Sequence, residues 1–216
     1  MTSSSQELPL QPLRDRTIGA YLDALEAPQP APGGGSVAGL TGALAASLGQ
    51  MVVSLTDEPE ASAALGSTAD DMAALRASLL TGSEADERAY SGYIDATKLP
   101  KGSSEEKAAR RAAMQAALRR SAEAPLGIAE YALGVLDRLE SVARYGGRQT
   151  LSDAEIAITL ARTSVLSALA TVRVNLPLIK DDELSASFGS RADDLERRAA
   201  ERTDACMAVL GERRKR

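Results

Sequence analysis

The 216-residue sequence has no histidine and no tryptophan, and it has only one cysteine, Cys206. Without histidine, the side chain that most often exchanges protons near neutral pH and most often binds metals is missing, so acid–base chemistry must use Asp, Glu, Lys or Tyr. One cysteine excludes an intrachain disulfide and a cysteine-cluster metal site. We therefore expect a cytoplasmic protein that binds no metal.

Aromatic residues and net charge are also scarce. Aromatics make up 3% of the chain, against 44% hydrophobic residues in which alanine dominates. Such a core requires thin helices that pack closely. The net charge of −5 gives no reason to expect nucleic acid or an anionic membrane as a partner.

Helical periodicity runs through nearly the whole chain, and no stretch alternates usefully with a period of two. We predict an all-α, single-domain, up-and-down bundle of six to eight helices that dimerises through its helices. A flexible leader (1–14) would precede the helical domain (15–212), and a basic tail (213–216) would follow it. The predicted helices cover about 16–27, 36–56, 60–98, 103–145, with a kink or break at Pro125, 152–176 and 182–210.

The predicted helix 36–56 contains no charged residue. Its scattered Ser, Thr, Gly and Gln residues, without basic anchors at either flank, indicate a buried central helix rather than a membrane span. Gly35, Gly39 and Ala43 recur every four residues, a spacing that lets another backbone approach closely. The approaching helix could belong to a second subunit. Ser36 is expected to cap this helix.

The glycines Gly33, Gly34 and Gly35 stand at the mouth of this helix. At a helix start the backbone N–H groups are free and the dipole is positive, so glycines there allow an anionic or polar group to touch the backbone. No strand precedes them and no lysine follows, so we do not expect a nucleotide triphosphate site.

Asp86 stands where the helical pattern of 60–98 reserves a place for a hydrophobic residue. A helical wheel puts it in the stripe that contains Leu79 and Tyr90. If the helix broke near Gly82, Asp86 would instead be a first-turn residue that interacts favourably with the helix dipole. Otherwise Asp86 is buried, and burial would raise its pKa into a range useful for acid–base catalysis.

Two arginines, Arg162 and Arg173, are the only charges beyond the first turn of the predicted helix 152–176. They share one line of the helix with Glu155, because eleven residues are close to a whole number of turns. This line is either a solvated edge or a basic groove for an anionic ligand.

Five blocks occur in order: APGGGSVAGL, DERAYSGYIDATKLPKGSSEEK, APLGIAE, GGRQTLSDAEIA and VRVNLPLIKD. Together they resemble the cyclodeaminase/cyclohydrolase family, which comprises the C-terminal domain of formiminotransferase-cyclodeaminase and the stand-alone methenyltetrahydrofolate cyclohydrolases. The resemblance implies an all-α homodimer with a folate site near the subunit interface. It implies that Asp86 is the catalytic carboxylate. The residues it implies for substrate binding are Gly33, Gly34, Gly35, Ser36, Asn175 and Tyr90, the last at the family's phenylalanine position.

The function that the resemblance implies is hydrolysis of 5,10-methenyltetrahydrofolate to 10-formyltetrahydrofolate, or the related cyclodeamination of formimino-folate. A tetrahydrofolate derivative would be the substrate, with no bound cofactor and with no nucleic acid or membrane as a partner. The alternative is a catalytically weakened, dimeric folate-binding or interaction module. The acidic segment DEPEAS (57–62) favours that alternative, because the family has basic residues there that would contact a folate glutamate tail.

Overall fold

The computed structural model describes residues 11–215, and every regular element in this range is a helix. Three short 3-10 helices, Leu13–Asp15, Arg148–Thr150 and Leu176–Leu178, flank the longer ones. The α-helices are α1 (Ile18–Glu26), α2 (Gly34–Ser54), α3 (Pro59–Leu65), α4 (Thr68–Lys98), α5 (Ser104–Tyr145), α6 (Leu151–Asn175) and α7 (Asp182–Arg214). The prediction of an all-α bundle is confirmed for the described residues.

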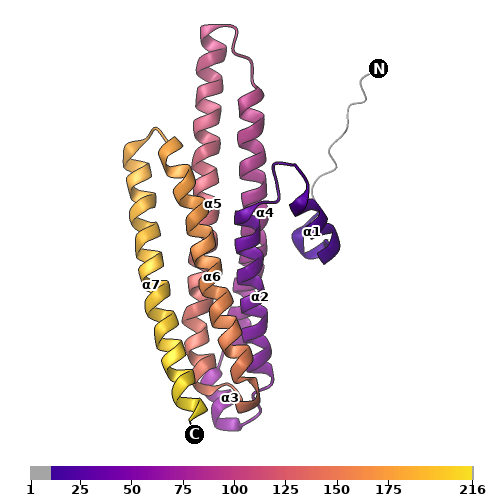
Figure 1. The fold of residues 1–216 in the computed structure, drawn as a ribbon, viewed down its shortest axis with the longest axis vertical. Helices are drawn as coiled ribbons and strands as arrows, with labels where there is room; N and C mark the ends of the chain where they lie inside the picture. Colours follow the sequence, from indigo (N-terminus) through magenta and orange to yellow (C-terminus); the bar gives the residue numbers. More distant parts are fainter. Residues whose placement is uncertain (1–10, 216) are drawn as a thin grey trace.

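Helices α2, α4, α5 and α6 form the centre of the bundle, and α7 packs against α5 and α6 (Figure 1). The hairpin of α4 and α5 extends beyond the other helices at one end, while α3 closes the opposite end. The small α1 lies to one side of the bundle, next to the part of α4 that is level with the first residues of α2. This arrangement brings the start of α2, the middle of α4 and α5, and the end of α6 together.

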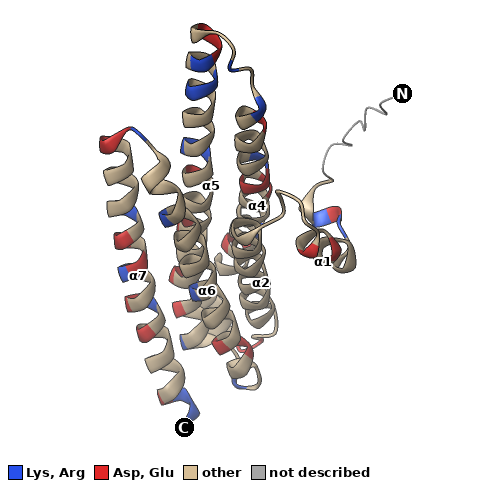
Figure 2. Cartoon of the chain, turned by 45° about the horizontal axis from the view of Figure 1, so that its top comes forward, with Lys and Arg blue, Asp and Glu red and all other residues tan. Residues whose placement is uncertain are grey.

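Helix α2 carries no Lys, Arg, Asp or Glu and is uncharged along its whole length (Figure 2). Its small residues let α4 approach closely: a Cβ added to Gly39 would lie 2.1 Å from Ser83 Oγ and 2.9 Å from the Leu79 carbonyl oxygen. The neighbour that uses this spacing is therefore a helix of the same chain. Both α2 and the segment Arg148–Leu178 are long and apolar enough to cross a membrane, and about half of each is buried inside the bundle.

The helical stretch predicted over 60–98 breaks at Gly66 and not at Gly82. Gly66 has a φ of +47°, a left-handed conformation that favours glycine, and it ends α3. Helix α4 then runs without interruption from Thr68 to Lys98. Asp86 consequently lies in the middle of a continuous helix, and the alternative that made it a first-turn residue is wrong.

Proline 125 does not split α5, which is continuous over 42 residues. A proline has no N–H to donate to the carbonyl four residues earlier, here that of Ser121. The side chain of Asn175 on α6 supplies the missing donor, because its Nδ2 lies 3.0 Å from the Ser121 carbonyl oxygen. One polar side chain thus links two helices at the point where the proline interrupts the backbone pattern.

Residues near both ends of the described range make contacts with the bundle. Most of the expected leader lies outside the described residues, but Leu13 is buried and donates its N–H to Glu84 Oε1 at 2.8 Å. At the other end α7 includes Arg213, whose guanidinium donates to the Ala143 carbonyl oxygen at 2.7 Å. The described part of the basic tail is therefore a packed helix end.

Candidate functional site

A cavity of about 340 Å³ lies at the N-terminal end of α2. Its walls come from the loop before α2 and from α2, α4, α5 and α6. The lining residues are Gln29, Pro30, Ala31, Pro32, Gly33, Gly34, Gly35, Asp86, Tyr90, Ser121, Thr171, Val174 and Asn175. The structure thus brings together every predicted site residue except Ser36.

Asp86 is the only charged residue among those that line the cavity. It is 8% exposed, which confirms the prediction that it lies on a buried face of its helix. Burial and, to a smaller extent, the negative charge of Glu87 raise its pKa from 3.8 to about 6, against a hydrogen bond from the Ser36 backbone N–H that lowers it. The group can therefore exchange a proton near neutral pH.

Of the three glycines, Gly35 is the one that must lack a side chain for Asp86 to occupy its position. A Cβ at Gly35 would lie 2.2 to 2.4 Å from the carboxyl atoms of Asp86, whereas one at Gly34 would have its nearest contact at 3.7 Å and one at Gly33 none within 4 Å. The N–H of Ser36 in the first turn of α2 hydrogen-bonds the same carboxylate. The glycine-lined helix start is therefore occupied by a carboxylate of the protein itself.

Glu87, next to Asp86 in the chain, is a buried residue that the sequence patterns did not single out. It is 1% exposed, and Arg16 holds it in a two-pronged ion pair with Nη1–Oε1 and Nη2–Oε2 distances of 3.1 and 2.8 Å. Buried carboxylates need such partners, because an unpaired one is costly. Arg16 precedes α1, 71 residues earlier in the chain, so no local spacing could have revealed the pair.

Ser36 does not line the cavity, and it is not the cap of α2, a position held by Gly33. Its hydroxyl is buried and donates to Glu87 Oε1 at 2.8 Å. Because that hydrogen is used, the Tyr21 hydroxyl, 3.0 Å away, must be the donor to Ser36 Oγ. The Ser36 side chain thus belongs to a buried network behind the cavity, and only its backbone N–H reaches Asp86.

Asn175 and Ser121 form the neutral part of the cavity wall. The Asn175 Nδ2 donates to the carbonyl oxygens of Ser121 at 3.0 Å and of Thr171 at 2.9 Å. The Ser121 Oγ is buried and has no hydrogen-bond partner among the described residues. Sequence patterns did not single out Ser121, and only the structure shows that its side chain borders the cavity.

Tyr90 lines the cavity but is 44% exposed, so its assignment to the core stripe was wrong. Tyr93, three residues later in α4, packs against the core and does not border the cavity. The acidic segment 57–62 follows the C-terminal end of α2, whose 21 residues span about 30 Å, and so it lies far from this cavity.

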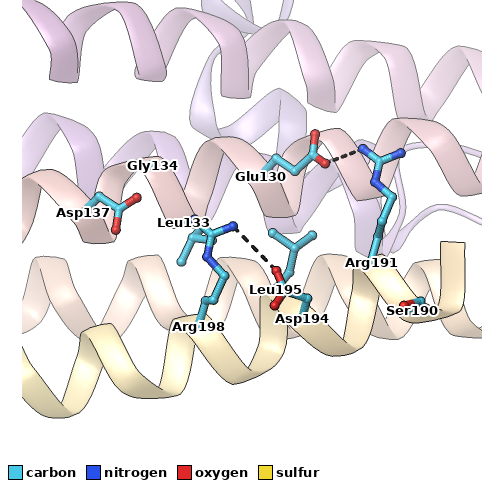
Figure 3. Close-up of a pocket in the computed structure, with 9 residues that line it drawn as sticks. All are labelled: Glu130, Leu133, Gly134, Asp137, Ser190, Arg191, Asp194, Leu195 and Arg198. Carbon is cyan, nitrogen blue, oxygen red and sulfur yellow. Dashed lines mark hydrogen bonds and ion pairs between the residues drawn. The ribbon is translucent and has the colours of Figure 1, made fainter. Parts of the chain in front are cut away.

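On the predicted line of α6, Arg162 is exposed to solvent, whereas Arg173 pairs with residues of a neighbouring helix. Arg173 pairs with Asp193 at 2.9 Å and with Glu196, both on α7. Similar pairs fill the groove between α5 and α7, where Arg191 contacts Glu130 and Arg198 contacts Asp194 (Figure 3). Each of these four charged side chains therefore has a partner of opposite sign.

The cavity around Asp86 suits a ligand that carries positive charge. No Lys or Arg stands among its described lining residues, and a carboxylate in such surroundings attracts a cation. No group of three or more His, Cys, Asp or Glu side chains within residues 11–215 is placed to hold a metal ion. The site can therefore take up and return one proton beside a bound, cationic organic group.

The fold and the site together define an all-helical protein with a buried carboxylate at the base of a glycine-lined cavity. The family model described as formiminotransferase-cyclodeaminase matches residues 17–194. The chain therefore belongs to this family.

Named relatives fall into two groups. A methenyltetrahydrofolate cyclohydrolase from Methylorubrum extorquens is 37% identical over 172 residues, which cover 77% of this chain and 82% of that protein. The rat formimidoyltransferase-cyclodeaminase is 34% identical over 207 residues, which cover 94% of this chain but only 38% of the rat protein. A crystal structure of formiminotetrahydrofolate cyclodeaminase from Thermotoga maritima shares the fold, with a TM-score of 0.82 at 21% identity, over 92% of this chain and 98% of that one.

Proposed function

We propose that this protein is a folate one-carbon enzyme that hydrolyses 5,10-methenyltetrahydrofolate to 10-formyltetrahydrofolate, with Asp86 as its acid–base group. The observation that carries the proposal is the buried Asp86 carboxylate, the only charged group among the described residues that line the cavity. The proposed substrate carries a positive charge spread over an N–C–N group, which a lone carboxylate would attract.

The proposed reaction uses Asp86 twice. Water adds to the central carbon of the cationic N–C–N group, and the proton that the water loses passes to the carboxylate. The neutral tetrahedral intermediate then breaks its bond between carbon and N5. The carboxylic acid returns the proton to N5, and the hydroxyl proton leaves to solvent as the formyl carbonyl forms. A pKa of about 6 suits a group that must both accept and donate at neutral pH.

The related cyclodeamination passes through a similar tetrahedral centre, from which ammonia leaves as the ring closes, so the same carboxylate could serve it. The cyclohydrolase is preferred because the relative of that name matches this chain over most of its own length. The rat cyclodeaminase is matched over only 38% of its length.

A direct assay tests the proposal. Purified protein is incubated with 5,10-methenyltetrahydrofolate, and the loss of its near-ultraviolet absorbance is compared with the spontaneous rate. Asp86→Asn should lower turnover about 10²–10⁴-fold, the usual contribution of general acid–base catalysis. The exposed Asp95 on the same helix gives a matched control, and Asp95→Asn should leave turnover unchanged. Turnover that survives in Asp86→Asn would contradict the proposal, and folate binding without turnover would indicate a binding module instead.

We also propose that the protein is a homodimer. Leu44 on α2 and Ile156 and Val174 on α6 are exposed, and large apolar side chains on central helices are typical of a covered interface. Val174 also borders the cavity, so a partner on this face would lie close to the site. Light scattering after size-exclusion chromatography should give about twice the 22.5 kDa mass of the chain, and a monomer would refute the proposal.

A further inference from the structure

The hydroxyl group of Ser121 is buried in the cavity wall without serving the fold. Ser121 is 6% exposed and borders the cavity, and its Oγ has no hydrogen-bond partner among the described residues. A buried hydroxyl without a partner destabilises a protein, so nearly all of them are hydrogen-bonded. Serines inside helices commonly donate to the carbonyl one turn earlier, as Ser47 does here to Ala43 at 2.8 Å. Ser121 does not, so its buried hydroxyl is left in the cavity wall without a partner among the described residues.

The side-chain amide of Asn175 is fixed in one orientation. Two backbone carbonyls, those of Ser121 and Thr171, lie 3.0 and 2.9 Å from its Nδ2. A carbonyl oxygen only accepts hydrogen bonds, so the amide nitrogen must be the atom that meets both. Both amide hydrogens are then used, and Oδ1 is left as an acceptor without a partner among the described residues.

Pro125 is the reason that one of these carbonyls is available. In an uninterrupted helix the N–H of residue 125 would bond the Ser121 carbonyl, and the proline removes it. The same residue, Ser121, therefore offers its carbonyl to Asn175 and its hydroxyl to the cavity. Pro125 acts as a positioning residue, because it is absent from the cavity wall yet sets the orientation of a side chain that forms it.

We propose that Ser121 Oγ and Asn175 Oδ1 form a donor–acceptor pair that recognises the edge of a flat heterocycle. Asn175 Oδ1 accepts a hydrogen bond from a ring N–H, and the Ser121 hydroxyl donates to a ring nitrogen or carbonyl oxygen next to it. The ligand is identified as a folate on the basis of the proposed function, since a pteridine ring offers such an edge. In this arrangement Asp86 binds the charged part of the ligand, while Ser121 and Asn175 hydrogen-bond its neutral part.

Two serine variants separate a binding role from a structural one. Ser121→Ala should weaken the binding of 5-formyltetrahydrofolate, measured by titration calorimetry, and raise KM for 5,10-methenyltetrahydrofolate about tenfold, the effect of one good hydrogen bond. It should not lower the melting temperature, because it removes a hydroxyl that has no partner. The control is Ser164→Ala, which removes a buried hydroxyl that donates to the Ala38 carbonyl at 2.7 Å. This control should lower the melting temperature and leave the affinity within about twofold.

The calorimetric measurement keeps this proposal separate from the proposed function. If Ser121→Ala binds the folate as tightly as the wild type, the pair is wrong whatever the turnover. If the wild type binds the folate without turning over the methenyl compound, the proposed function fails, and a weaker complex with Ser121→Ala still supports the pair. If the wild type does not bind the folate at all, both proposals are wrong.

Discussion

Asp86→Asn is expected to make the protein more stable at pH 7 to 8 even though it removes the proposed catalytic group. In the folded protein the carboxyl pKa is about 6, against an ordinary value of 3.8, because burial and the neighbouring Glu87 disfavour the charge. Each pH unit between the two values corresponds to 1.36 kcal/mol, so ionised Asp86 costs the folded state about 3 kcal/mol. Asparagine has nearly the same shape and no charge.

The pH dependence of this difference follows from the direction of the pKa change. Because the pKa is higher in the folded state, the protonated carboxyl stabilises the fold fully below about pH 3.8. That contribution is lost as the pH rises through about 6. The free energy of unfolding of Asp86→Asn minus that of the wild type should therefore increase by about 2.4 kcal/mol between pH 4 and pH 7 and then level off.

Urea unfolding followed by circular dichroism at several pH values from 4 to 8 measures this difference directly. Asp95→Asn controls for general charge effects, since Asp95 is exposed on the same helix, and its difference from the wild type should stay nearly constant with pH. A constant difference for Asp86→Asn, or a less stable variant at pH 8, would refute the reasoning. Either result would mean that the folded protein stabilises the Asp86 charge after all.

Two further predictions concern the cavity walls. Gly35→Ala should destabilise the protein by about 1–3 kcal/mol and reduce turnover, because the new methyl group would displace the Asp86 carboxylate. Gly34→Ala should be nearly neutral in thermal unfolding, because a Cβ there would have its nearest contact at 3.7 Å. Asn175→Ala should cost about 1–3 kcal/mol because it orphans the backbone carbonyl that Pro125 leaves without a donor. Adding Pro125→Ala restores a backbone N–H and should recover part of the stability lost in Asn175→Ala. Urea unfolding of both single variants and the double variant measures this coupling, and purely additive effects would contradict the role of Asn175 as the substitute donor.

The periodicity of α4 made the burial of Asp86 predictable, because a helical wheel needs only local sequence. The position of the helix break was not predictable in the same way. Gly66 and Gly82 both interrupt a helical pattern, yet only Gly66 adopts a positive φ. Gly82 is needed for packing, since a Cβ there would lie 2.9 Å from Ile128 on α5. From the sequence alone, a glycine that ends a helix cannot be distinguished from one that allows a neighbouring helix to pack closely.

The buried network behind the cavity could not be predicted from sequence patterns, for the same reason. The burial of Glu87 was not predictable, because its partner Arg16 comes from a segment 71 positions away. Ser36 was expected to cap α2, but Gly33 holds that position and α2 turns the Ser36 side chain toward Glu87. Local spacing predicts which face of a helix a residue occupies, but only the tertiary structure decides what that face meets.

The adjacent carboxylates Asp86 and Glu87 have different environments, and the difference explains how one group could both accept and donate a proton. Arg16 neutralises Glu87, while Asp86 faces a cavity without a described cationic side chain. A cationic substrate would supply the missing charge, lower the pKa of Asp86 and keep it ionised as the base that takes the proton of water. Addition of water discharges the cation, so the pKa returns toward about 6 and the protonated group becomes an acid. In the proposed reaction, the substrate's own change of charge therefore converts Asp86 from base to acid at the step that requires it.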